Sequence, residues 1–332
     1  MKVLLYSGHQ NWVEKSGVGR SIYHQRKALE ESHIPYTTNL KEDFDIIHIN
    51  TLFPSSLRIS KKAKANGKKV VYHAHSTMED FKNSFRGSNM MAPLFKKWIM
   101  KCYSSADLII TPTPYAKNLL TGYGLEKPIE CISNGIDLSF FKKDIHGRKR
   151  FREKYHFGYE DKIIISVGLF IERKGIIDFV KLAKSMPEYQ FIWFGYTNLN
   201  IVPSQVKEAV NTKLSNLHFP GYVSKEDLSD AYSGGDLFVF LTHEETEGIV
   251  LLEALAMKIP VLIRDIPIYK DWLTNGENSY KADSMAEFQK KIKGILSGSL
   301  PYLGENGYQV AQDRDIKKIG SQLKIVYQTL LD

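Results

Sequence analysis

The chain is poor in the features that mark several large classes of protein. It has only two cysteines, Cys102 and Cys131, without metal-ligand spacing, so neither a disulfide framework nor a cysteine-rich metal site is expected. No apolar run approaches the roughly 18 residues of a membrane-spanning helix. The short apolar start of the chain soon meets a polar loop, which indicates a first buried strand and not a signal peptide. A complete GxGxxG fingerprint and a Walker pattern are both missing.

The excess of positive charge lies in one half of the chain. Residues 1–150 hold 24 basic and 13 acidic residues, whereas residues 151–332 hold 21 and 24. The first half therefore carries all of the excess charge, which is typical of a half that meets an anionic membrane surface or a polyanion. A soluble protein with a basic isoelectric point is the alternative. Nucleic acid is not expected as a partner, because the aromatic residues of this half are not interleaved with its charges.

Strand-like and helix-like segments alternate along the whole chain. Apolar runs of 3 to 7 residues, most of them followed by a helical pattern, predict the strands 2–6, 45–50, 69–74, 106–111, 129–132, 162–168, 190–195, 217–220, 235–241, 259–263 and 279–281. Such alternation predicts an α/β fold with doubly wound parallel sheets. A charged segment with two glycines at 144–161 separates two halves. We expect domains at 1–148 and 149–315, with a helix at 316–332 that packs back on the first domain.

Within residues 242–257, Glu245 and Glu253 stand eight positions apart with an apolar run before the second. Gly248 is placed to open a helix over 249–257, which leaves Glu245 in the loop before the helix and Glu253 about one turn inside it. A helix N-terminus preceded by such a loop is a site for anions. The alternative from the pattern alone is an amphipathic helix with solvated acids.

Three further positions lie at the carboxyl ends of predicted strands, where parallel sheets bind ligands. Gly17 and Gly19 let the backbone approach a phosphate or sugar closely. Arg173 and Lys174, between Gly168 and Gly175, stand beside a helix start and suit a diphosphate. His75 is placed to hydrogen-bond a substrate hydroxyl. The structural alternatives are a flexible loop at the two glycines, solvated surface charge at the basic pair and a histidine that caps a loop.

Taken together, these motifs resemble the retaining family 4 glycosyltransferases of the GT-B fold. The resemblance rests on the early glycine loop, the histidine after a strand, SNGID at 133–137, VGLFIERKG at 167–175, GYV at 221–223 and the two glutamates followed by ALAMKIPV. It implies two Rossmann-like domains that face a central cleft.

The resemblance also implies a role for each motif. Lys174 and Arg173 would hold the nucleotide diphosphate, Glu245 the hydroxyls of the donor sugar and Glu253 the ribose. Further contacts to the donor would come from His75, Gly17, Gly19, Gly168, Gly248, Ile249 and Val250. Leu169 stands where many members have arginine, so the phosphate contact would shift to Arg173.

The first half also contains the segments EKSGVGRSIYHQ, DIIHINT, HAHSTMEDFKNSFRGSN and APLFKKW. In these segments it resembles bacterial synthases that add a second hexose to a monoglucosyl glycolipid. Residues 89–103 combine Met, Leu, Phe, Trp and Ile with lysines, the composition of an interfacial amphipathic helix. A core helix with a solvated basic edge is the alternative. The residues assigned to the membrane are Lys61, Lys62, Lys96, Lys97, Trp98 and Lys101.

The resemblance therefore predicts transfer of glucose from UDP-glucose to the sugar of monoglucosyldiacylglycerol, by a peripheral protein on the cytoplasmic face of the membrane. No cofactor and no metal requirement are expected. A galactosyl- or polysaccharide-directed transferase of the same fold is an alternative, and a non-catalytic nucleotide-sugar-binding protein is an alternative of another class.

Overall fold

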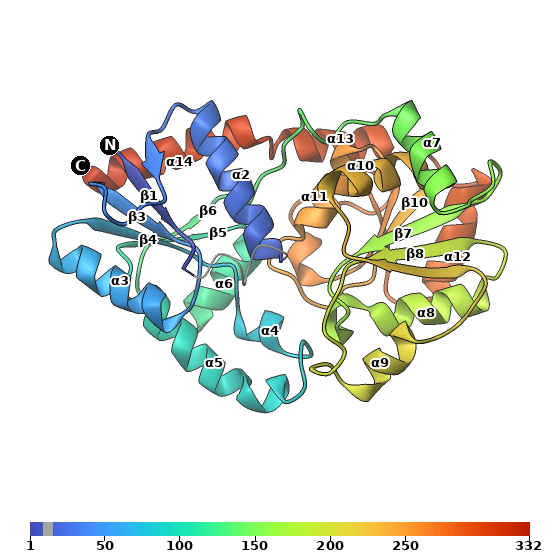
Figure 1. Cartoon of the computed structure of the whole chain (residues 1–332), viewed down its shortest axis with the longest axis horizontal. Helices are drawn as coiled ribbons and strands as arrows, with labels where there is room; N and C mark the ends of the chain where they lie inside the picture. Colours follow the sequence, from blue (N-terminus) through green and yellow to red (C-terminus); the bar gives the residue numbers. More distant parts are fainter. Residues whose placement is uncertain (9–15) are drawn as a thin grey trace.

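The computed structural model describes residues 1–8 and 16–332. Most of the polar loop expected after the first strand, residues 9–15, lies outside the described residues. Two six-stranded parallel sheets form two bodies side by side, as Figure 1 shows. The prediction of two successive doubly wound α/β halves is therefore confirmed.

The first sheet has the strand order β2-β1-β3-β4-β5-β6. Its strands are short apolar runs, and most are buried on both faces, as expected for parallel sheets. The bounds are β1 Val3–Tyr6, β2 Tyr36–Thr37, β3 Ile46–Ile49, β4 Lys69–His73, β5 Leu108–Thr111 and β6 Ile129–Cys131. The helices of this part are α2 Gly17–Glu31, α3 Pro54–Ala65, α4 Met78–Phe81, α5 Ser88–Tyr103 and α6 Pro114–Gly122. Side chains of α3, α5 and α6 form the core on one face, and those of α2 form the core on the other.

The second sheet has the order β12-β11-β10-β7-β8-β9. Its strands are β7 Ile163–Val167, β8 Gln190–Phe194, β9 Leu217–Gly221, β10 Leu237–Phe240, β11 Val261–Arg264 and β12 Tyr280–Ala282. The helices are α7 Ile145–Lys154, η1 Glu172–Lys174, α8 Ile176–Ser185, α9 Ser204–Val210, α10 Lys225–Gly234, α11 Ile249–Ala256, η2 Pro267–Tyr269, α12 Met285–Ser297 and α13 Gly304–Gln312. Side chains of α7, α10, α11 and α13 pack on one face, and those of α8, α9 and α12 pack on the other.

The chain crosses between the two bodies twice, and the crossings touch each other. The first follows β6, and the second joins α13 to α14 (Ile316–Leu331). The Ile136 N–H donates to the Arg314 carbonyl at 2.9 Å, and the Ile316 N–H donates to the Ile136 carbonyl at 3.1 Å. The predicted boundary at 148 falls inside α7, and α7 packs on α10 of the second body.

After the second crossing, α14 runs along α2 on the first body (Figure 1). Ile316, Ile319, Leu323 and Tyr327 enter the core beneath the first sheet. The two helices approach so closely that a side chain at Gly320 would overlap the Ala28 carbonyl oxygen. A glycine is therefore required at this contact.

Candidate functional site

The carboxyl ends of β7 and β8 come together through glycines. The Gly168 N–H donates to the Phe194 carbonyl at 2.9 Å. Gly195 has a φ of +141°, and a side chain there would overlap the Gly168 carbonyl oxygen. At this end of the second sheet the backbone therefore has no side chains at Gly168 and Gly195. The loop that follows β7 begins here and contains Arg173 and Lys174.

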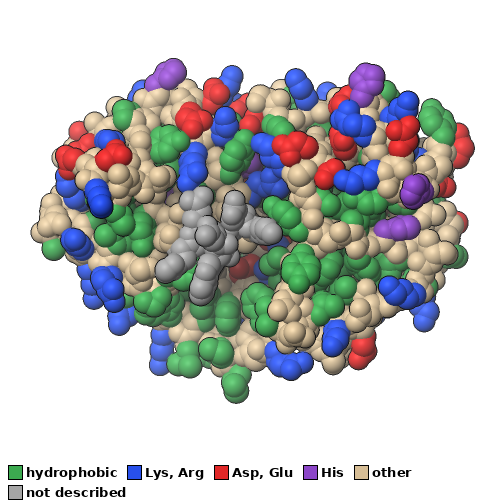
Figure 2. Space-filling model, viewed as in Figure 1, with side chains coloured by type: hydrophobic (Ala, Val, Ile, Leu, Met, Phe, Trp, Pro, Cys, Tyr) green, Lys and Arg blue, Asp and Glu red, His purple; other side chains and the backbone are tan. Residues whose placement is uncertain are grey.

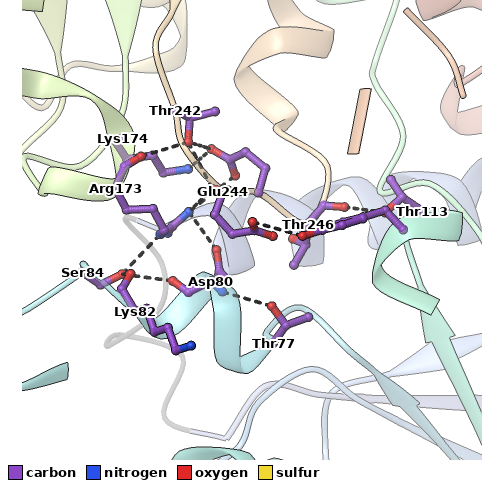
Figure 3. A network of polar contacts seen from close by, with 12 residues as sticks. Thr77, Asp80, Lys82, Ser84, Thr113, Arg173, Lys174, Thr242, Glu244 and Thr246 are labelled. Atoms are coloured by element: carbon purple, nitrogen blue, oxygen red, sulfur yellow. Dashed lines mark hydrogen bonds and ion pairs between the residues drawn. The ribbon is translucent and has the colours of Figure 1, made fainter. Parts of the chain in front are cut away.

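Lys174 and Glu245 form an ion pair between the two loops that follow β7 and β10. The Lys174 ammonium donates to the Glu245 Oε1, and the Thr242 hydroxyl donates to the same oxygen at 3.0 Å. Glu245 is only 5% exposed. Burial lowers the pKa of Lys174, and the Glu245 carboxylate opposes that effect. Figure 3 shows this cluster, in which Lys174, Arg173 and Thr242 converge from the second body. The pair places a cation beside the carboxylate predicted to hold the donor sugar.

Arg173 points to the other body. Its Nη1 donates to the Glu244 carbonyl at 2.6 Å and lies 2.8 Å from Asp80 Oδ1, and its Nε donates to the Ser84 hydroxyl at 3.3 Å. Asp80 and Ser84 lie in and just after α4, a short helix capped by Thr77 that the sequence did not predict. Figure 3 shows Arg173 between these residues. The guanidinium thus contacts both bodies at their boundary. Its contact with a diphosphate stays a prediction.

The stretch 242–257 has the local structure predicted for it. Gly248 adopts a left-handed φ of +92° and begins α11, so Glu245 lies in the loop and Glu253 within the helix. The alternative of two solvated acids is wrong, because both carboxylates are buried. The N-terminal amides of Ile249 and Val250 point back toward the loop, as the predicted phosphate contact requires.

Glu253 is fully buried and already has partners from both bodies. The Tyr232 hydroxyl donates to its Oε2 at 3.1 Å, and the Nε of Arg20 lies 3.3 Å from its Oε1. Burial raises the pKa of Glu253, and the Arg20 charge opposes the rise. The ribose contact predicted for Glu253 would have to share the carboxylate with Arg20.

Arg20 belongs to the first turn of α2, the helix that carries Gly17 and Gly19. Ser16 caps this helix by accepting a hydrogen bond from the Gly19 N–H at 3.4 Å. Within the described part of the chain, a side chain added at Gly17 would meet no neighbouring atom. The glycine loop therefore lies near the α11 side of the site, where Arg20 reaches Glu253.

His75 lies at the end of a row of stacked histidine rings. Its ring is 4.2 Å from that of His73 at an angle of 10°, and His73 in turn stacks on His48. The His75 Nε2 is 2.8 Å from the Asn50 Oδ1. Burial lowers the pKa of His75 to about 3, so its ring is neutral near pH 7. A neutral ring suits the predicted hydrogen bond to a sugar hydroxyl, which stays a prediction.

Two acids of the 242–257 stretch, Glu244 and Glu247, were not predicted as functional. The Tyr115 hydroxyl of α6 donates to Glu244 Oε2 at 3.1 Å, and the Thr113 hydroxyl donates to the Thr246 carbonyl at 2.9 Å. Glu247 is 1% exposed and hydrogen-bonds the turn after β6. The sequence signal that could have identified them is the density of acids, three within four residues soon after a buried strand.

Within residues 1–8 and 16–332, no group of three or more His, Cys, Asp or Glu side chains is arranged to hold a metal ion.

The candidate membrane surface lies on α5, the helix that contains the expected segment 89–103. Trp98 packs against the core of the first sheet and donates its indole N–H to the Leu52 carbonyl at 2.8 Å. Trp98 is thus half-buried against the core, and its contact with a membrane stays a prediction. Lys96 is half-buried over the Tyr123 ring. The side chains that protrude instead are Met90, Met91 and Leu94, which are 81%, 52% and 64% exposed.

These three residues, which we call the α5 apolar patch, lie among exposed lysines. Lys97 and Lys101 are exposed on the same helix, and Lys61 and Lys62 are exposed on α3. Figure 2 shows hydrophobic side chains at the lower edge of the first body, with basic side chains next to them. Among the described residues, no helix is both long and apolar enough to cross a membrane. The patch and its lysines have the chemistry of a surface that lies on an anionic bilayer.

Comparison with known proteins covers nearly the whole chain. Residues 147–310 match the family model of glycosyl transferases group 1, and residues 26–140 match that of glycosyltransferase family 4. The processive diacylglycerol alpha-glucosyltransferase of Acholeplasma laidlawii is 42% identical, with 100% of this chain and 99% of that protein aligned. The alpha-galactosylglucosyldiacylglycerol synthase of Streptococcus pneumoniae is 25% identical over 83% of this chain and 74% of that protein.

Solved structures show the same fold at low sequence identity. The Anabaena protein HepE in complex with UDP and glucose aligns over 99% of both chains with a TM-score of 0.78 and 16% identity. Sucrose-phosphate synthase from Thermosynechococcus elongatus aligns over 99% of both chains with a TM-score of 0.80 and 17% identity. The two-body architecture described above is the one that these proteins share.

Proposed function

The chain belongs to the family 4 glycosyltransferases of the GT-B fold, and from that premise we propose that it transfers glucose from UDP-glucose to the sugar of monoglucosyldiacylglycerol with retention of configuration. The observation that carries the proposal is the 42% identity, over the full length of both chains, to a diacylglycerol alpha-glucosyltransferase. The proposed product is diglucosyldiacylglycerol, a membrane glycolipid.

The proposed chemistry depends on the positive groups of the site, the Lys174 ammonium and the N-terminus of α11. In a retaining transfer by same-face attack, the bond from the sugar to the diphosphate breaks while the acceptor oxygen bonds to the same carbon. The leaving diphosphate takes the acceptor proton and gains negative charge. In this proposal Lys174 and the amides at the start of α11 would stabilise that charge, and such electrostatic stabilisation is usually the largest single contribution to catalysis. We therefore propose that no metal ion is required.

In this proposal Glu245 orients the donor sugar. Its carboxylate is held by Lys174 and Thr242, so its position is fixed before a donor enters. A fixed acceptor of hydrogen bonds from sugar hydroxyls sets the orientation of the donor carbon. His75, neutral and half-buried, would donate or accept one further hydrogen bond to the same sugar. Neither residue is a nucleophile in this mechanism.

The acceptor side of the proposal rests on the first body. The α5 apolar patch would enter the headgroup region, and the exposed lysines of α3 and α5 would meet anionic lipids. The protein would then lie on the cytoplasmic leaflet as a peripheral enzyme, with the glycolipid headgroup reaching the cleft from the membrane.

The proposal is tested by varying the sugar donor and the lipid acceptor independently. The protein is incubated with UDP-glucose or UDP-galactose and anionic vesicles that contain either diacylglycerol or monoglucosyldiacylglycerol, and the lipid products are identified by mass spectrometry. We expect diglucosyldiacylglycerol from UDP-glucose and the monoglucosyl lipid. A galactosyl product, or transfer only to soluble saccharides, would overturn the assignment. UDP binding without any transfer or donor hydrolysis would indicate a binding protein.

A further inference from the structure

Glu247 lies on the same loop as Glu245 but contacts a different part of the molecule. Its Oε2 accepts hydrogen bonds from the Asn134 backbone N–H at 2.9 Å and the Asn134 Nδ2 at 2.7 Å. Its Oε1 accepts from the Ser133 hydroxyl. Three donors from one turn, 113 and 114 residues earlier in the chain, thus hold a side chain that is 1% exposed.

That turn is the place where the chain leaves the first body. It follows β6 and runs into Ile136, which pairs with Arg314 and Ile316 of the second crossing. The two crossings are covalent links between the sheets, and they lie side by side. Any rotation of one body against the other must therefore turn about this pair of segments, as hinge motions do.

Asn134 also contacts the helix that carries the glycine loop. The Ser21 hydroxyl of α2 donates to the Asn134 Oδ1 at 2.5 Å. Both ends of the Asn134 amide are thus occupied, one by the first body and the other by Glu247. A change in the angle between the bodies would be transmitted through Asn134 to the loop of Glu245.

We propose that Glu247 is a positioning residue that fixes the donor loop, residues 242–247, to the hinge between the two bodies. Lys174 and Thr242 hold Glu245 from the side of the second sheet, and Glu247 holds the other end of the loop. Glu245 then keeps its orientation toward the donor sugar only when the hinge turn is in the position seen here. This inference rests on the proposed function, since it assumes that Glu245 binds a donor sugar.

The test compares Glu247→Ala, Glu247→Gln, Asn134→Ala and the double alanine variant. Steady-state transfer gives kcat and KM for UDP-glucose, calorimetry gives the Kd of UDP, and thermal unfolding gives Tm. We expect Glu247→Ala to lower kcat on the order of 100-fold, the loss that a displacement of about 1 Å causes. The Kd of UDP should stay within about 3-fold, because UDP lacks the sugar that Glu245 orients.

The remaining variants separate positioning from stability. Glu247→Gln keeps an oxygen for Asn134 and should retain most of the activity. The double variant should be no slower than Glu247→Ala alone, because both changes break the same contact. Asp236→Ala is a matched control. Its carboxylate also accepts from a backbone N–H, that of Ile163 at 2.9 Å, but at the opposite end of the second sheet. This variant should lower Tm and leave kcat unchanged.

Three outcomes would overturn the inference. They are a wild-type kcat in Glu247→Ala, multiplicative losses in the double variant, and a loss of kcat in Asp236→Ala equal to that in Glu247→Ala. The last would show that the effect follows stability alone. A wild-type protein that transfers no sugar would count against the proposed function instead, so the two failures are distinguishable.

Discussion

Arg20 and Glu253 face each other across the boundary between the two bodies, with the Arg20 Nε 3.3 Å from the Glu253 Oε1. Glu253 is fully buried, and its other oxygen is held by Tyr232. A buried carboxylate that loses its cation is left uncompensated in a medium of low polarity. The pair therefore links the observed arrangement of the two bodies to the ionisation of Glu253.

Replacing Arg20 by methionine should lower the free energy of unfolding by about 3 kcal/mol, the cost of removing one partner of a buried pair. The measurement is denaturant unfolding of Arg20→Met against the wild type. Adding Glu253→Gln to the first change should restore part of the loss, because no unpaired charge then remains. If the double variant were less stable than Arg20→Met, the pair would not be the cause.

Removing the Lys174 ammonium should slow transfer much more than it weakens acceptor binding. We expect Lys174→Ala to lower kcat by about 100-fold or more, because charge on the leaving diphosphate is no longer stabilised. Initial rates at saturating acceptor measure the effect. Lys181→Ala is the control, since Lys181 is an exposed residue on α8. An unchanged kcat in Lys174→Ala would show that this lysine does not hold the diphosphate.

Acidic substitutions in the α5 apolar patch should weaken membrane binding. Met90→Asp and Leu94→Asp each remove an exposed apolar side chain whose burial contributes about 1.5–3 kcal/mol, so the affinity for anionic vesicles should fall at least about tenfold. Flotation with anionic vesicles gives the bound fraction. Tyr159→Asp changes a residue that is 83% exposed on the second body and should float like the wild type. Equal flotation of all variants would exclude the patch as the membrane contact.

Stability should depend on pH through Glu244. Burial raises the pKa of this carboxyl to about 7, while the Tyr115 hydrogen bond lowers it. The folded state therefore favours the protonated acid. Its stabilising contribution is fully present below the ordinary glutamate pKa and is lost as the pH rises through about 7. Between about pH 5 and pH 8 the Tm of the wild type should fall relative to that of Glu244→Gln, which is uncharged throughout. Parallel Tm curves would contradict this assignment.

Much of the fold could be predicted because its strands are short apolar runs buried on both faces. The run at 163–167 and the strand that precedes Glu245 need no distant information to be recognised. The strand β2 has two residues and α4 has four, so neither produces a periodic pattern. The packing of Trp98 on the core was not predicted, because α5 has apolar side chains on its buried face and on its exposed face. Periodicity alone could not select between these faces.

The positions of the site residues were easier to predict than their partners. A loop after a strand, with a cation or an acid in it, can be recognised locally, as for Lys174 and Glu245. The contacts of Glu247 with Asn134 and of Arg20 with Glu253 join residues more than 100 positions apart. No local pattern encodes which distant side chain will neutralise a buried charge, so these partners appear only in the folded chain.

The return of α14 to the first body has a practical consequence for dissecting this protein. The first domain is built from two separate pieces of chain, and the last helix supplies Ile319, Leu323 and Tyr327 to its core. A fragment that stops after β6 would leave that apolar surface exposed to water and should aggregate. An isolated first domain that folds would need α14 fused by a linker after β6, with the second body left out between them. A binding assay on the first body alone should start from such a fusion.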